Sequence, residues 1–130
     1  MGRIRPRELR GLTRAQLEEL PVEVLDEVAF GFHSGDAIRL PLSSIHIRYP
    51  GDLESASADI ETRKDALALR RTHGRLPVQV HLRNGLFDLE DGHHRYVAAT
   101  MLGDEAIWAE VEIKDDPIAV ILGEKPRPAR

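Results

Sequence analysis

The most informative segment of the sequence is Asp91-Gly92-His93-His94-Arg95-Tyr96-Val97-Ala98-Ala99, which joins a strand-like run to a helix-like run. The strand-like run is Leu86 to Glu90, and the helix-like run continues to Leu102. The first N–H groups of a helix lack partners within the helix, and the helix dipole is positive there. The junction is therefore predicted to bind an anion.

The side chains at this junction carry most of the chemistry of the chain. Gly92 permits a tight turn or a close approach to a ligand, and Arg95 offers a planar fork of donors that suits phosphate. His93 and His94 add donors or proton carriers. Asp91 can hold Mg²⁺ or accept a hydroxyl proton. The structural alternative is that Asp91 caps the helix while Arg95 forms a salt bridge.

Alternation and turn chemistry predict the strands. Val78, Val80 and Leu82 alternate with polar residues, and Asn84-Gly85 is a strong hairpin signal. Further extended segments are expected at 37–40, 46–48 and 107–113. Trp108 lies on the face opposite Ile107 and is expected to pack under a helix.

Helical spacing and capping signals predict the helices. A pair is expected near the N-terminus, one starting at the capping box of Thr13 and Gln16 and one at Pro21. A long helix is expected over 57–73, ended by Gly74, after a turn over 49–52. Strands mixed with helices indicate an α/β (α+β) domain with a small mixed sheet and flanking helices.

Length and composition favour one soluble globular domain in the cytoplasm. The chain has 130 residues, no cysteine, and no apolar run of membrane-span length, so we expect no thiol chemistry and no membrane partner. The net charge of −4 disfavours DNA binding. Both ends are nevertheless basic, which indicates either solvated or disordered termini or tails that bind nucleic acid or a partner. The basic residues are Arg3, Arg5, Arg7, Arg10 and Arg14 at one end, and Lys125, Arg127 and Arg130 at the other.

Three segments in this order resemble the ParB-type N-terminal domain and sulfiredoxin, which share a fold. They are Leu40–Ile45, Gly74–Val80 and Asp91–Ala99. The resemblance implies an N-terminal helical extension (1–36), a ParB/sulfiredoxin-like domain (37–116) and a C-terminal tail (117–130). Partition proteins continue into a domain that reads a DNA site, and we expect this chain to lack it.

The resemblance also implies roles for individual residues. His94 and Arg95 match family residues that contact nucleotide phosphates, and Arg48 lies near a family Arg-Pro pair, although Tyr49 intervenes here. Arg48 is otherwise a solvated strand residue. His93 stands where sulfiredoxin has its cysteine, so sulfinic acid reduction is excluded.

The expected function is nucleoside-triphosphate binding, with ATP or CTP and Mg²⁺. Arg48, Gly92, His93, His94 and Arg95 would hold the phosphates, Asp91 the metal, and Asp91 and His94 would be catalytic. The protein would hydrolyse the nucleotide or transfer its phosphate to an unknown small-molecule acceptor, with a homodimer as a further option. Two alternatives stay open: a ParB-like DNA-associated protein, either nuclease or partition-related, and a nucleotide-gated binding module without catalysis.

An acidic cluster and a basic helix start are further candidates for parts of the site. Asp88, Glu90 and Asp91 could gather a divalent ion, although solvent-facing carboxylates are the preferred interpretation for Asp88. Thr62, Arg63 and Lys64 could face the pocket, although a solvated helix face is favoured. Adjacent His93 and His94 are poorly placed to share one metal ion.

Overall fold

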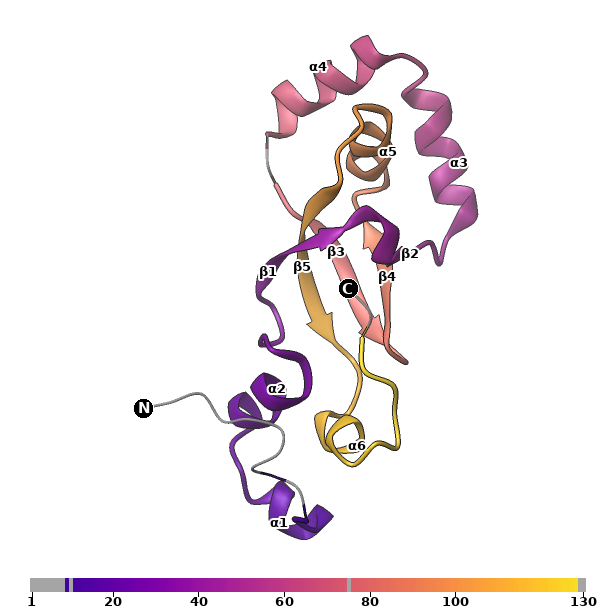
Figure 1. The fold of residues 1–130 in the computed structure, drawn as a ribbon. Helices are drawn as coiled ribbons and strands as arrows, with labels where there is room; N and C mark the ends of the chain where they lie inside the picture. The colour runs from indigo at the N-terminus through magenta and orange to yellow at the C-terminus, as the bar shows by residue number, and fades with distance from the viewer. Residues whose placement is uncertain (1–8, 10, 75, 129–130) are drawn as a thin grey trace.

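The structure is a computed structural model that describes residue 9 and residues 11–74 and 76–128. One mixed sheet of five strands lies at its centre, in the order β1-β5-β3-β4-β2 (Figure 1). The strands are β1 (Ala37–Pro41), β2 (Ile45–His46), β3 (Val78–Arg83), β4 (Leu86–Asp91) and β5 (Ala106–Ile113). The helices are α1 (Arg14–Glu18), α2 (Val22–Phe30), α3 (Pro50–Asp59), α4 (Arg63–His73), α5 (His93–Met101) and α6 (Pro117–Ile121). The predicted fold class is therefore confirmed.

The sheet has one apolar and one polar face. Val78, Val80 and Leu82 are fully or almost fully buried in the main core, as their alternation predicts. β3 pairs antiparallel with β4 and parallel with β5, while the two-residue strand β2 adds to the other edge of β4 in parallel. The opposite face carries residues such as His81 and Glu112, which face each other across β3 and β5.

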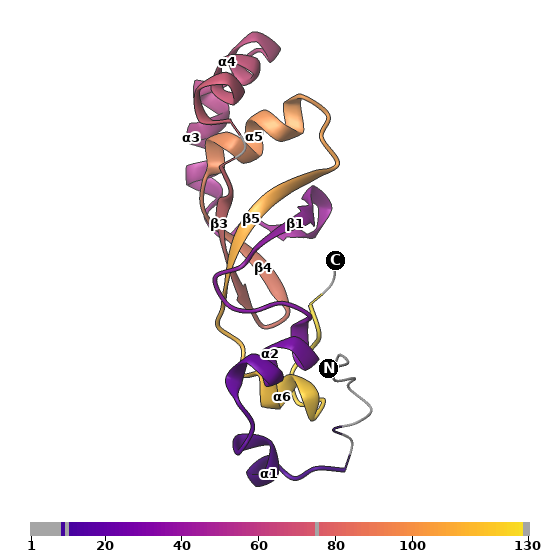
Figure 2. The same ribbon diagram turned by 90° about the vertical axis from the view of Figure 1, so that its left-hand side faces the viewer.

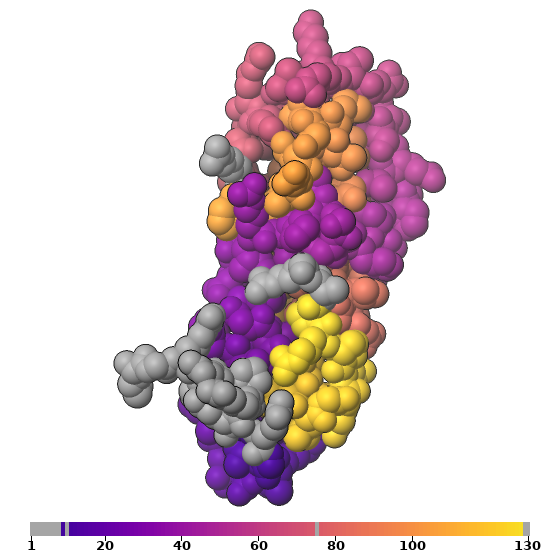
Figure 3. All heavy atoms as spheres, in the orientation of Figure 1, coloured from indigo at the N-terminus to yellow at the C-terminus, as the bar shows by residue number. Residues whose placement is uncertain are grey.

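The helices gather at the two ends of the sheet (Figures 1 and 2). At one end, α5 packs against α3 and α4 around a small core that includes Ala56, Ala66 and Val97. Figure 3 shows α5 at the surface between these two helices. At the other end α6 packs against α1 and α2, so the two terminal segments share a core that includes Leu17 and Ile118.

Two of the local predictions are wrong. The expected turn over 49–52 is the start of α3, because Pro50 occupies the first helical position, where its fixed φ suits a helix. The expected single helix over 57–73 is two helices. Thr62 accepts a hydrogen bond from the Asp65 N–H, and the Asp65 carboxylate accepts one from the Thr62 N–H, so α4 begins with its own capping box.

The β3–β4 turn is held by a residue far away in the chain. Asn84 and Gly85 both adopt positive φ, as the predicted hairpin requires. The carboxylate of Asp115 accepts hydrogen bonds from both backbone N–H groups, at 2.6 and 2.9 Å. The turn is thereby attached to the segment that follows β5.

Among the described residues, no helix is long and apolar enough to cross a membrane.

Candidate functional site

The N-terminus of α5 begins at a glycine that the fold requires. Gly92 is the N-cap residue, with φ of 97°. A Cβ added at Gly92 would lie 2.7 Å from Val78 Cγ1, so any larger residue would force β3 and α5 apart. No side chain caps the helix, so its first N–H groups point outward without a side-chain partner. The alternative in which Asp91 caps α5 is not what the structure shows, because its carboxylate accepts only the Gly92 N–H, at 2.9 Å.

His93 is buried at the first position of α5. Its side chain lies next to the Tyr49 ring, with 6.5 Å between the ring centroids and an edge-on angle. Its Nε2 atom is buried and has no hydrogen-bond partner among the described residues. A buried polar atom without a partner costs free energy. It therefore marks a place where a ligand or a water molecule would be stabilising.

His94 and Arg95 point away from each other, because successive residues of a helix are rotated by about 100°. The Nε2 of His94 lies 2.8 Å from the Asp59 carboxylate at the end of α3. The Arg95 guanidinium donates to the Pro77 carbonyl at 3.0 Å, rather than forming a salt bridge. His93, His94 and Arg95 therefore lie on one helical turn but contact different groups. His93 lies beside Tyr49, His94 beside Asp59, and Arg95 beside the Pro77 carbonyl.

Arg48 lies in the short segment between the edge strand β2 and α3. Its guanidinium is 3.4 Å from the Glu90 carboxylate and 5.5 Å from the centroid of the Tyr49 ring. The structure therefore brings Arg48, Tyr49 and His93 together on one side of the α5 N-terminus. Arg95 belongs to the other side.

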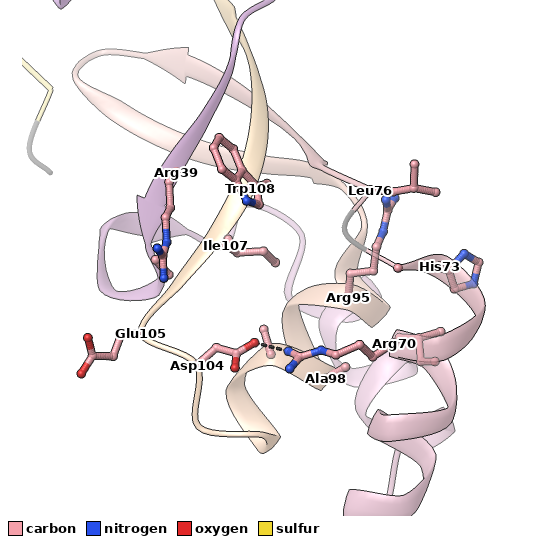
Figure 4. A pocket seen from close by; sticks show the side chains of 14 residues that line it. Arg39, Arg70, His73, Leu76, Arg95, Ala98, Asp104, Glu105, Ile107 and Trp108 are labelled. Carbon is pink, nitrogen blue, oxygen red and sulfur yellow. Dashed lines mark hydrogen bonds and ion pairs between the residues drawn. The ribbon is translucent and has the colours of Figure 1, made fainter.

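Arg95 faces a cavity of about 390 Å³ between α4, α5 and the β1–β5 edge (Figure 4). Small-molecule sites typically have volumes of this order. Trp108, expected beneath a helix, instead lies on the cavity wall and is 44% exposed. The lining residues are Arg39, Leu69, Arg70, His73, Gly74, Leu76, Arg95, Ala98, Ala99, Asp104, Glu105, Ala106, Ile107 and Trp108.

The cavity has more cationic than anionic groups. Arg70 is paired with Asp104, whereas Arg39 and Arg95 have no carboxylate partner among the described residues. Arg39 lies opposite Trp108 in the β1–β5 register. A flat aromatic surface next to unpaired guanidinium groups suits a ligand with a ring and negative charge.

The acidic cluster does not form a metal site within the described part of the chain. No group of three or more His, Asp or Glu side chains is arranged there to hold an ion. The interpretation of Asp88 as a solvent-facing carboxylate is wrong, since Asp88 is buried and lies 2.7 Å from Nδ1 of His46. Thr62 caps α4, and Arg63 and Lys64 are exposed, as the solvated alternative predicts.

The described basic residues near the two ends bind within the molecule. Arg14 pairs with Asp116 at 3.2 Å and with Glu124 at 2.6 Å, and these contacts raise the pKa of the guanidinium. Lys125 donates to the Asn84 side chain, and Arg127 donates to the Ala29 carbonyl. These three side chains therefore contact the folded part of the molecule. Arg3, Arg5, Arg7, Arg10 and Arg130 lie outside the described residues.

Sequence reasoning missed Arg39 and Tyr49 and misplaced Trp108. Arg39 stands alone among apolar neighbours in β1, and a charged residue on an edge strand is an ordinary feature. Only the pairing of β1 with β5 brings Arg39 to Trp108. Tyr49 precedes a proline and was assigned to a turn, so nothing in the sequence linked it to His93.

The solved structures to which the chain is similar include a sulfiredoxin and a ParB. Sulfiredoxin from Arabidopsis thaliana is 25% identical, with 60% of this chain and 85% of that chain covered and a TM-score of 0.48. The C-terminally truncated chromosome-partitioning protein ParB from Caulobacter crescentus, complexed with CTP-gamma-S, is 18% identical, with 74% and 56% covered and a TM-score of 0.40. The same protein complexed to the centromeric parS site is 20% identical, with 66% and 44% covered and a TM-score of 0.36.

The chain spans about half the length of these two ParB structures. Sulfiredoxin and ParB are also the proteins that the three sequence motifs resemble. No protein-family model and no curated protein matches the chain.

Proposed function

We propose that the protein binds a nucleoside triphosphate, with the phosphates at the α5 N-terminus and the base in the adjacent cavity. The observation that carries this proposal is the position of Arg95, which belongs both to the first turn of α5 and to the cavity wall. A ligand that occupies both places must carry negative charge at one end. The ring of such a ligand would lie against Trp108.

The α5 N-terminus supplies the features that phosphates need. Gly92 has no side chain to cap the helix, and the N–H groups of His94 and Arg95 are among those that lack a side-chain cap. The buried Nε2 atom of His93 has no hydrogen-bond partner among the described residues, so it could bond to a phosphate oxygen. Arg48 would approach from the Tyr49 side, where its guanidinium lies 3.4 Å from the Glu90 carboxylate and against the Tyr49 ring. The motif resemblance of Asp91–Ala99 supports the same assignment.

Mg²⁺ would arrive with the nucleotide, since it usually keeps several waters and binds through one or two carboxylates plus phosphates. Asp91 directly precedes the N-cap residue Gly92, and one of its carboxylate oxygens accepts the Gly92 N–H. Asp91 would therefore be one ligand of the Mg²⁺ ion, and the phosphates and waters would supply the others. If the protein is an enzyme, it would hydrolyse the terminal phosphate of the nucleotide or transfer it to an acceptor.

The test is thermal unfolding with ATP, ADP, CTP or GTP in the presence of Mg²⁺. A nucleotide at about 100 times its Kd should raise Tm by about 10 °C. Arg95→Ala should weaken binding roughly 10- to 100-fold, because it removes a charge-assisted contact. Arg71→Ala is the matched control, since Arg71 is exposed on α4 and does not line the cavity. No shift with any nucleotide would refute the proposal.

A further inference from the structure

A buried carboxylate and an exposed imidazole form a hydrogen-bonded pair on the polar face of the sheet. Asp88 of β4 is 7% exposed, and its Oδ1 lies 2.7 Å from Nδ1 of His46 on the edge strand β2. The two residues are direct neighbours in the β2–β4 register. The backbone therefore holds both side chains in place.

This geometry leaves one atom of His46 available for proton transfer. When Asp88 accepts the Nδ1–H, the neutral ring carries its lone pair on Nε2. The His46 side chain is 53% exposed, so Nε2 can meet a ligand. Histidines that act as general bases are commonly paired with a carboxylate, which holds the imidazole ring in place and stabilises the imidazolium.

Two other histidines on this side of the molecule are less suited to the role. Nδ1 of His81 lies 3.2 Å from Glu90 but is buried and has no hydrogen-bond partner among the described residues, and Nε2 lies 3.1 Å from Glu112. His94 also has a carboxylate partner, but Asp59 is 66% exposed. A solvated carboxylate holds a ring weakly.

Successive contacts connect His46 to the α5 N-terminus. Arg48 lies two residues beyond His46 and contacts Glu90, just as His46 contacts Asp88, so the two side chains share one face of the sheet. The Arg48 guanidinium lies against Tyr49, and Tyr49 lies against His93. The charged groups around His46 are thus Asp88 and Glu90 of β4, Arg48 beyond β2, and the His81–Glu112 pair across the sheet.

We infer that His46 is the proton acceptor for phosphate transfer at this site, with Asp88 as its positioning residue. The inference rests on the proposed nucleotide binding, and it replaces Asp91 and His94 in the catalytic role. An oxygen of water or of a small hydroxyl compound attacks the terminal phosphorus while its proton passes to Nε2. The bond from that phosphorus to the bridging oxygen breaks, and the nucleoside diphosphate leaves with the electron pair. The imidazolium then returns its proton to solvent.

The experiment measures nucleotide binding and phosphate release in parallel on the full chain. Binding is followed by thermal shift, and release by inorganic phosphate produced from the stabilising nucleotide with Mg²⁺. His46→Gln should keep the thermal shift and lose release by about 100-fold or more. Asp88→Asn, whose amide oxygen still accepts the Nδ1–H, should move the midpoint of the pH–rate profile to lower pH. His33→Gln is the control, because His33 lies away from this site, beside Glu27 and Asp36.

The other possible results contradict either this inference or the proposed function. Binding with no phosphate release, or release that survives His46→Gln, overturns this inference and leaves the proposed function standing. Loss of release in His94→Gln with normal release in His46→Gln would assign the role to His94 instead. Absence of binding in the unaltered protein overturns both. Should His46→Gln fail to fold, the pH profile of Asp88→Asn decides, because an unmoved midpoint rejects the positioning role.

Discussion

Gly92 lies so close to Val78 that no side chain fits between them: a Cβ at Gly92 would be 2.7 Å from Val78 Cγ1. This contact sets α5 directly against β3. It also explains why the helix start is uncapped, since the left-handed conformation at Gly92 occupies the capping position.

Gly92→Ala should therefore destabilise the protein through both overpacking and backbone strain, by about 2–4 kcal/mol. Gly103→Ala is the matched control, because Gly103 has a similar positive φ of 76° and nothing within 4 Å of the added Cβ. That variant should show the strain alone, about 1 kcal/mol. Urea denaturation of both variants measures the difference, and equal losses would contradict the steric argument.

Asp115→Ala should destabilise the β3–β4 hairpin. The change leaves the N–H groups of Asn84 and Gly85 without their acceptor in a half-buried place, at a cost of about 2–4 kcal/mol in the free energy of unfolding. Asp115→Asn retains an acceptor oxygen and should lose less. Hydrogen exchange at the two amides provides the local check, and unchanged protection in Asp115→Ala would count against the clamp.

Asp26 should make stability fall as the pH rises. Burial is the main cause that raises the pKa of this carboxyl above its ordinary value of 3.8. The fold then favours the protonated form, so the contribution is fully present below 3.8 and is lost as the pH rises through the higher folded pKa. Relative to Asp26→Asn, the unaltered protein should lose stability as the pH rises above 3.8 and through the raised folded pKa of Asp26. Urea denaturation of both proteins over a range of pH measures this. A difference in the free energy of unfolding that does not change with pH would disprove the prediction.

Thr62→Ala should loosen the start of α4 by about 1 kcal/mol. Its hydroxyl accepts the Asp65 N–H, and hydrogen bonds from Thr62 lower the pKa of the Asp65 carboxyl. A lowered folded pKa means that the cap contributes above the ordinary value of 3.8 and is lost as the pH falls through the folded pKa. The stability gap between the variant and the unaltered protein should therefore narrow in acid.

Local patterns predicted the sheet well, because the signals involved are short-range. The alternation of Val78, Val80 and Leu82 and the Asn84-Gly85 turn needed no knowledge of distant residues. The capping box at Thr62 was present in the sequence too, and the single helix over 57–73 was predicted only because the helical pattern was extended through it. The start of α3 was missed because Pro50 suits both a turn and a first helical position.

The candidate site was predicted in part. The sequence placed Gly92 and Arg95 correctly at a helix start, but helical rotation sends Arg95 to a cavity and His94 to Asp59. The hydrogen bond between His46 and Asp88 joins residues 42 positions apart. Such a pair depends on strand order, and strand order is set by the packing of the whole domain rather than by either segment.

The exposed position of Trp108 has a practical consequence. The chain contains one tryptophan, and that residue lies on the cavity wall. All indole fluorescence of the protein therefore originates at the cavity. A bound planar ring that stacks on Trp108 would quench this emission, whereas an event confined to the α1, α2 and α6 end of the molecule would leave it unchanged.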